Sequence, residues 1–159
     1  MIIRTQQEIE YENECRRIIQ QYPKQIKKVF EYEYCELEFD FLGFLNVYQI
    51  NIPKDFTIID LGCYLGIQSI YFENHKQYIG IDIATPIEYR FNLHNTKHYK
   101  ISIEDFIKDL SKYDLNKTFA ICSYVPLDDN IYNDIAKKFP YHKIQYCDNI
   151  ISENYPKEN

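Results

Sequence analysis

Short apolar runs alternate with amphipathic stretches from residue 56 onwards. Five runs have the length of buried strands and are bounded by polar turn residues: 56–61, 77–82, 98–102, 118–124 and 142–148. The stretches between them have the period of helices: 66–74, 86–95, 103–113 and 127–139, the last with Asp128 or Asp129 as its cap. This alternation predicts an α/β fold, a three-layer doubly wound parallel sheet with the strand order 3-2-1-4-5.

The same pattern divides the chain into three segments. Residues 1–54 are expected to form a mostly helical N-terminal cap, and residues 55–150 the sheet domain. Residues 151–159 are a polar tail that we expect to fray. Within the first segment, residues 29–41 alternate in polarity but slip in phase at Cys35. That slip fits either a bulged strand or a chain entering a helix, and the pattern leaves both open.

Glycine is concentrated where the first two predicted strands end. The chain has four glycines in 159 residues, and three of them, Gly62, Gly66 and Gly80, fall within nineteen positions. We expect Gly62 to permit a tight strand-to-helix turn and to let a ligand lie against the main chain. Gly66 would let the following helix pack closely on the strand, with its first N–H groups facing an anionic group of the ligand.

An aspartate lies at the end of each of these two strands. Asp60 ends the first, and Asp82 ends the second, twenty residues beyond Gly62. Nicotinamide dinucleotides favour G-x-G-x-x-G, and this turn has Tyr64 at the second glycine position. A carboxylate at position 60 suits a ligand with a positive group, and one at position 82 suits a ribose diol. A ligand with an amine, a cationic sulfur and a ribose would satisfy both acids.

The two motifs resemble those of a known family. "IIDLGCYLG" (58–66) followed by "YIGIDI" (78–83) is similar to motifs I and II of the class I S-adenosylmethionine-dependent methyltransferases, over roughly residues 55–147. The resemblance implies a Rossmann-like fold, S-adenosylmethionine as cofactor, and methyl transfer by direct displacement at the sulfonium to a small molecule or a protein. The chain departs from motif I at position 64, where tyrosine replaces the usual glycine.

The resemblance also implies roles for individual residues. Asp60, Gly62, Cys63 and Tyr64 would line the methionine and sulfonium end, next to Gly66, and Tyr64 is expected to point outward as one wall of the pocket. Asp82 would hold the ribose hydroxyls, and Ile83 would pack on the adenine. Two registers are open for the other adenine contacts, which would come either from Asp105 and Phe106 or from Ser102 and Ile103.

The active-site loop of the family would follow the fourth strand, at "CSYVP" (122–126). Tyr124 is a weak catalytic candidate there, and an ordinary strand end followed by a proline turn is the simpler interpretation. We expect no metal site. The four histidines are expected at the surface rather than as bases: His75, His94, His98 and His142.

The family fold ends in an antiparallel hairpin that this chain is expected to lack, since about a dozen residues follow the fifth predicted strand. The fifth strand would then be an open edge unless the N-terminal segment, a partner or a second copy of the chain covers it. This leaves an enzyme of shortened fold, one part of a complex, or a non-catalytic cofactor-binding or interaction protein of the same fold.

Composition narrows the class of partner and the compartment. The formal net charge of −6 disfavours a nucleic-acid substrate. Residues 16–28 carry five basic and no acidic side chains, which indicates either a solvated face or a patch that steers a substrate. Five cysteines without a C-x-x-C pair suggest neither a disulfide framework nor a zinc site. With no signal peptide and no apolar run of membrane-spanning length, we expect no membrane association and a cytoplasmic protein.

Overall fold

The structure is a computed structural model that describes residues 5, 6, 9, 10, 13, 17, 20–25, 27, 28, 51–123, 125–147 and 149–157. The described residues before position 29 are mostly helical, as expected for the N-terminal segment. The choice between a bulged strand and a helix for residues 29–41 lies outside the described residues.

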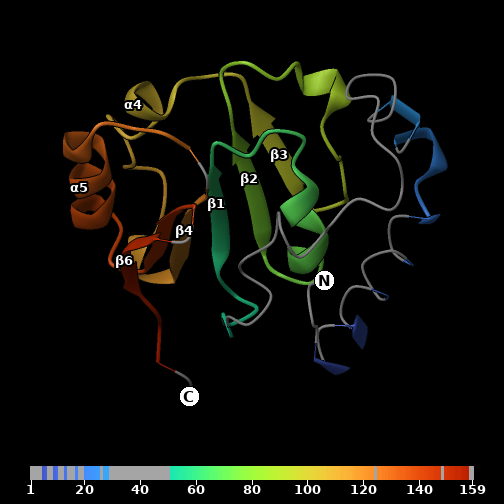
Figure 1. The fold of residues 1–159 in the computed structure, drawn as a ribbon, viewed down its shortest axis with the longest axis horizontal. Helices are drawn as coiled ribbons and strands as arrows, with labels where there is room; N and C mark the ends of the chain where they lie inside the picture. The colour runs from blue at the N-terminus through green and yellow to red at the C-terminus, as the bar shows by residue number, and fades with distance from the viewer. Residues whose placement is uncertain are drawn as a thin grey trace.

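A six-stranded, mostly parallel sheet forms the centre of the α/β fold, in the order β3-β2-β1-β4-β5-β6 (Figure 1). Five strands run parallel to their neighbours, and β6 runs antiparallel to β5. The order predicted for the five parallel strands is found within this sheet. The strands are β1 (Thr57–Leu61), β2 (Gln77–Ile81), β3 (Thr96–Tyr99), β4 (Thr118–Ser123), β5 (His142–Tyr146) and β6 (Asn149–Asn154).

The sixth strand corrects two expectations about the end of the chain. β5 is not an open edge, because the chain turns back at Cys147, which has a positive φ of 53°, and β6 pairs along β5. The expected fraying tail is therefore strand as far as Asn154. The sequence did not indicate this strand because an edge strand needs few buried apolar residues. Ile150 is 52% exposed and Ile151 is 41% exposed, and their neighbours are polar. A homo-oligomer or a complex stays a prediction, but β6 occupies the β5 edge that it was expected to cover.

The helices are shorter than the periodicity predicts, and the last comes nearest to its predicted length. Helix α5 (Asp129–Lys138) begins after Asp128, as predicted, and buries Tyr132 and Ile135. The helix expected over 66–74 is a 3₁₀ helix, and the one expected over 86–95 is a single 3₁₀ turn bounded by extended residues. The remaining helical elements are also short: η1 (Ile67–Phe72), η2 (Ile87–Tyr89), α4 (Ile103–Phe106) and η3 (Leu115–Lys117).

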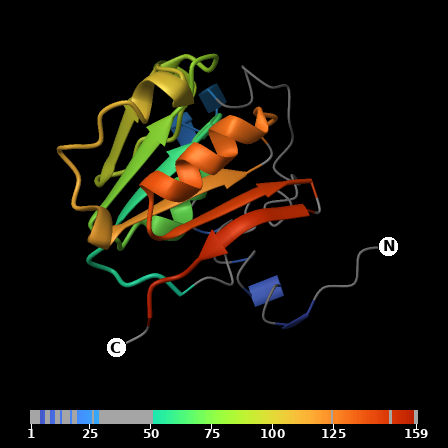
Figure 2. The same ribbon diagram turned by 90° about the vertical axis from the view of Figure 1, so that its left-hand side faces the viewer.

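The two faces of the sheet are covered by different elements. On one face, Ile59 and Leu61 of β1 pack with the buried side chains of α4 and α5, and Figure 2 shows α5 lying across the strands. On the other face, Ile58 packs with Phe72 of η1 and Phe119 of β4. Strand parity puts Asp60 on this second face with Ile58, at the carboxyl end of β1.

Two further properties concern only the described part of the chain. None of its helices combines the length and the apolar character needed to cross a bilayer. It also contains no group of three or more histidine, cysteine and acidic side chains that is arranged to hold a metal ion.

Candidate functional site

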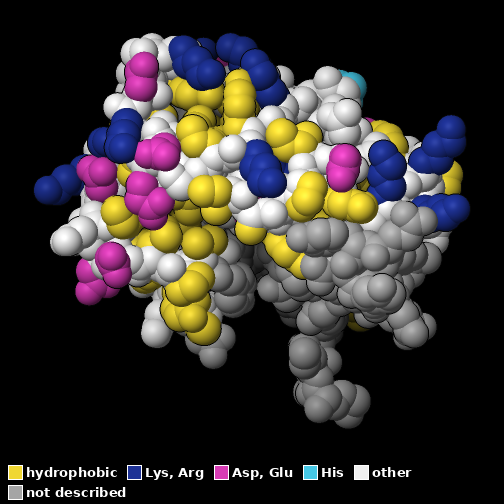
Figure 3. Space-filling view, turned by 90° about the horizontal axis from the view of Figure 1, so that it is seen from above, with side chains coloured by type: hydrophobic (Ala, Val, Ile, Leu, Met, Phe, Trp, Pro, Cys, Tyr) yellow, Lys and Arg dark blue, Asp and Glu magenta, His cyan; other side chains and the backbone are white. Residues whose placement is uncertain are grey.

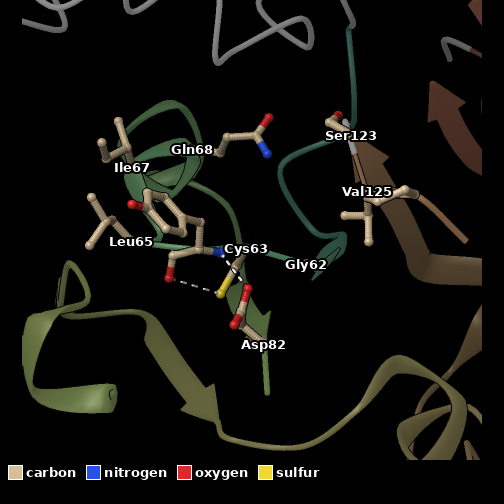
Figure 4. Close-up of a pocket in the computed structure, with 10 residues that line it drawn as sticks. Gly62, Cys63, Leu65, Ile67, Gln68, Asp82, Ser123 and Val125 are labelled. Carbon is tan, nitrogen blue, oxygen red and sulfur yellow. Dashed lines mark hydrogen bonds between the residues drawn. The ribbon is translucent and has the colours of Figure 1, made fainter. Parts of the chain in front are cut away.

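A cavity of about 440 Å³ opens beyond the carboxyl ends of β1, β2 and β4. Its volume lies within the range of small-molecule sites. In Figure 4, Asp82 and Cys63 lie on one side and Gln68 on the opposite side, while Leu65 and Ile67 face Ser123 and Val125 across the cavity. Gly62, Tyr64 and Pro126 complete the lining.

The turn between β1 and η1 has three residues with positive φ, namely Gly62 (80°), Tyr64 (56°) and Gly66 (69°). The N–H groups of Gly62 and Cys63 both donate to the carbonyl oxygen of Ile81, over 2.7 and 2.9 Å. The turn is therefore fixed to the end of β2, and its first two N–H groups are engaged there. Tyrosine at position 64 occupies a left-handed conformation that glycine adopts without strain.

Gly62 has no room for a side chain, but the group that lies against it is a protein side chain and not a ligand. A Cβ built on Gly62 would collide with Cγ2 of Val125 and would lie 3.4 Å from Cβ of that residue. Val125, from the loop after β4, thus lies directly against the main chain of the turn. We expected a ligand to lie against Gly62, but in this structure the side chain of Val125 lies there.

The carboxylate of Asp82 lines the cavity and holds two turns together. Its Oδ2 accepts from the N–H of Tyr64 at 3.1 Å, and its Oδ1 accepts from the N–H groups of Ala84 and Thr85 at 2.8 and 2.9 Å. Of the four lone pairs of the carboxylate, these bonds use three, so one on Oδ2 remains as an acceptor. The structure therefore joins Asp82 to the glycine turn, as the two motifs predict, and Tyr64 lines the cavity beside it.

The buried side chain of Arg90 holds the main chain at Asp82 in place. The side chain is 3% exposed, and its guanidinium donates to the carbonyl oxygens of Asp82, Thr85, Gly80 and Tyr99. These carbonyls belong to the ends of β2 and β3 and to the turn that follows β2. One buried cation thus ties three main-chain segments together. No sequence pattern singles out Arg90, since arginines are usually exposed.

Asp60 was expected to face the ligand, but the structure places it behind the cavity wall. It is fully buried, does not line the cavity, and its Oδ2 accepts from the hydroxyl of Tyr78 and from Nε2 of Gln68, the latter at 3.0 Å. Burial raises the pKa of Asp60 to about 7, against the lowering effect of these two hydrogen bonds. Asp60 is buried because strand parity turns it toward Tyr78 and the face that η1 covers.

Gln68 connects this buried carboxyl to the cavity. Its side chain is 7% exposed and lines the cavity, while its Nε2 donates to Asp60. Its Oε1 and the Oδ1 of Asp60 are both buried without a hydrogen-bond partner among the described residues. An unpaired buried acceptor costs about 1–3 kcal/mol, so the cavity wall favours a ligand with a hydrogen-bond donor at Gln68.

Cys63 lines the cavity as a neutral thiol. The residue is 5% exposed, and burial raises the pKa of its thiol well above the usual value. A thiol that stays protonated is a poor nucleophile, so Cys63 acts here as a small apolar side chain. A Cβ on Gly80 would collide with Nδ1 of His98 and would lie 2.9 Å from the Cys63 sulfur, which explains why β2 carries a glycine there.

Two other expected site residues lie near the cavity without lining it. Gly66 begins η1, and a Cβ there would lie 2.8 Å from Cε1 of His98, so its absence allows the histidine ring to approach the turn. Ile83 follows Asp82 and is 62% exposed. That exposure leaves its side chain accessible to a flat ring bound beside Asp82.

Neither register proposed for the adenine contacts reaches the cavity in this structure. Ile103 and Phe106 are buried in the core on the α4 and α5 side. Ser102 caps α4 by accepting from the N–H of Asp105, and the carboxylate of Asp105 pairs with Lys108 at the surface. Tyr124, the weak catalytic candidate, lies outside the described residues.

The expectation of surface histidines is wrong for two of the four. His75 and His142 are 8% and 5% exposed and bond to the carbonyl oxygens of Ile52 and Phe139. Burial lowers the pKa of His75, so its ring is neutral at neutral pH. These histidines fill structural positions, which polar flanking sequence does not reveal.

Some residues of the site had no signal strong enough to select them. Strand parity could have placed Tyr78 beside Asp60, because both lie at even positions of neighbouring parallel strands. No sequence pattern predicts that Val125 covers Gly62, since the loop after β4 has no regular geometry.

None of the models of known protein families matches this chain, and no curated protein sequence matches it either. The resemblance therefore rests on the two motifs.

Proposed function

We propose that the cavity binds S-adenosylmethionine and that the chain is a methyltransferase with a Rossmann-like, doubly wound sheet. The observation that carries the proposal is that Asp82 and the glycine turn line one cavity between the ends of β1, β2 and β4. In an open α/β sheet, ligands bind beyond the carboxyl ends of the strands where the strand order reverses, which here is between β1 and β4.

The residues present fit the cofactor at two points. The carboxylate of Asp82 has one lone pair of Oδ2 left for a ribose hydroxyl, and the exposed side chain of Ile83 is next to it for an adenine ring. Gln68 lines the cavity, and its buried Oε1 has no hydrogen-bond partner among the described residues, which suits the ammonium of a methionine portion. Asp60, behind Gln68, would add a favourable charge when ionised.

The cofactor would supply the activated methyl group on its sulfonium. The side chains of Leu65, Ile67 and Val125 supply apolar walls that exclude water and restrict orientation. Positioning two reactants in this way contributes much of the rate when the electrophile is already activated, so a general base is not required for a good nucleophile. The proposal places the protein in the cytoplasm, where thiols such as Cys63 and Cys122 stay reduced.

The methyl acceptor that we propose is a small molecule or a protein side chain. The acceptor would enter between Ser123, Pro126 and the apolar walls, and the described lining holds Asp82 as its only ionisable acid. The net charge of −6 repels a nucleic-acid backbone and leaves neutral or cationic acceptors favoured.

Calorimetric titration with S-adenosylmethionine and with S-adenosylhomocysteine tests the binding step. Asp82→Ala should weaken binding by roughly 1.5–3 kcal/mol, the scale of hydrogen bonds to a charged group. Asp105→Ala is the matched control, because Asp105 is exposed and pairs only with its helix neighbours. Thermal melts of both variants check folding, since Asp82 also accepts three main-chain hydrogen bonds. Absence of heat from folded wild-type protein with either ligand excludes the proposal.

A second candidate is a non-catalytic binding or interaction protein of the same fold. The position of Val125 against Gly62 favours it, because that side chain occupies the approach to the turn. Val125→Ala separates the two candidates. If the variant binds either ligand at least tenfold more tightly than wild type and neither protein transfers a labelled methyl group to lysate, the non-catalytic candidate is supported. Transfer by wild type with unchanged affinity in the variant supports the enzyme.

A further inference from the structure

A second cleft, of about 420 Å³, lies between the N-terminal helical residues and the loop that follows β2. Lys24 and Lys28 line it from the helix, and η2 and Arg90 line it from the loop. Figure 3 shows basic side chains gathered at the right-hand side of the molecule, over the N-terminal residues drawn in blue in Figure 1. This cleft is separate from the residues that line the cavity at the glycine turn.

A reciprocal pair of hydrogen bonds fixes the geometry of this cleft. The side-chain amide of Gln25 donates to the carbonyl oxygen of Asn92 at 2.8 Å, and its oxygen accepts from the N–H of the same residue. Gln25 lies next to Lys24 and three residues before Lys28, so this attachment holds both lysines at the rim. Two residues four positions apart share one face of a helix, about 6 Å apart along its axis.

The cleft is positively charged although the chain as a whole is negative. Lys24 and Lys28 are exposed, and Arg90 is 3% exposed with hydrogen bonds only to main-chain carbonyls in the described structure. Glu88 is the one acidic residue among the side chains that line the cleft. Three cations against one acid give a local excess of positive charge, in a chain with a formal net charge of −6.

We propose that this cleft binds the di- or triphosphate group of a small molecule. Lysine ammonium groups bind phosphate oxygens as point charges, and a helical turn between them suits a group with several charged oxygens in a row. The buried charge of Arg90 is poorly screened by solvent and adds to the attraction. An extended nucleic-acid backbone would meet the acidic remainder of the surface, so a small ligand fits better. This inference does not depend on the proposed methyltransferase activity.

Titration calorimetry of the full chain with tripolyphosphate at low and at physiological salt tests the proposal. Lys24→Gln and Lys28→Gln should each weaken binding roughly tenfold, the factor for one charge-assisted hydrogen bond. Glu88→Gln should tighten binding, because it removes the acid from the cleft. Lys27→Gln is the matched control, since Lys27 lies on the same helix and is exposed but does not line the cleft. Its affinity should equal that of wild type.

Two further ligands identify what the cleft recognises. Equal binding of adenosine triphosphate and tripolyphosphate indicates that the phosphates alone are recognised, and tighter binding of the nucleotide indicates a nucleotide site. Both results support the proposal. Citrate is the control for a polyanion without phosphate, and binding as tight as that of tripolyphosphate overturns it. Absence of tripolyphosphate binding, or an equal loss in the Lys27→Gln and Lys24→Gln variants, also overturns it.

Discussion

Val125 lies directly against Gly62, so that a residue of the loop after β4 covers the main chain of the turn after β1. The hydroxyl of Tyr132, in α5, fixes this loop by donating to the carbonyl oxygen of Val125 and accepting from the N–H of Leu127 at 3.0 Å. The loop after β4 is thus attached to the helix that follows it. The contact joins the turn after β1 to the loop after β4. The proposed ligand would either displace Val125 from this turn or bind against Val125 as part of the cavity wall.

Gly62→Ala should lower the free energy of unfolding by roughly 2–4 kcal/mol. About 1–2 kcal/mol comes from a Cβ in the left-handed conformation, and the remainder from the collision with Val125. Adding Val125→Ala should remove the collision and leave the backbone strain, so the double variant should be more stable than the two separate losses predict. Urea unfolding of the three variants measures this coupling. Strictly additive losses would show that the two side chains do not meet.

Arg90→Lys should lower the free energy of unfolding by roughly 3 kcal/mol. A lysine keeps the charge, but its single ammonium cannot reach the carbonyl oxygens of Asp82, Thr85 and Tyr99 together, so some of these groups lose their partner. Lys100→Gln is a matched surface control, because Lys100 is exposed and such substitutions change stability by less than about 0.5 kcal/mol. Equal melting temperatures for Arg90→Lys and wild type would contradict a structural role for the guanidinium.

The sequence predicted β1, β2 and β4 well because each is a mostly buried run with a turn at its end. β3, expected over 98–102, spans Thr96–Tyr99 instead, and none of its residues is buried. In β1, Ile58, Ile59 and Leu61 are all completely buried, and a run of this kind has few alternatives to a central strand. The glycine turn and Asp82 were also predictable. A left-handed backbone conformation favours glycine, and both a glycine and a carboxylate at a strand end can be recognised in a single sequence.

The elements that the sequence did not predict depend on contacts between distant residues. The helix expected over 86–95 is reduced to one 3₁₀ turn because the side chain of Arg90 bonds to the ends of β2 and β3 and the residue itself is extended. β6 exists because β5 offers it a partner, and its own residues carry little hydrophobic signal. Asp60 was assigned to the ligand because a carboxylate at the end of the first strand suits a positive group and matches the resemblance to motif I. Tyr78 and Gln68 make its burial possible, and both lie outside the "IIDLGCYLG" stretch that contains Asp60.

Asp60→Asn should stabilise the protein increasingly as the pH rises. The folded pKa of Asp60 is about 7, above its usual value of 3.8, so folding favours the protonated carboxyl. Stability from this group is complete below about pH 4 and is lost as the pH rises through about 7. Asparagine mimics the neutral acid and does not titrate, so the gap between variant and wild type should grow over that range to the order of a few kcal/mol and then stay constant.

Urea unfolding from about pH 5 to about pH 8 measures this gap, with Asp105→Asn as the control of opposite sign. The side-chain hydrogen bond from Lys108 lowers the pKa of Asp105, so its contribution is present above its usual pKa and the substitution should be slightly destabilising over the whole range. A gap for Asp60→Asn that does not change with pH would mean that Asp60 ionises equally in the folded and unfolded states. Its burial among Tyr78, Gln68 and β1 would then not govern its charge, and the proposed attraction for a cationic ligand would have to come from Asp82 alone.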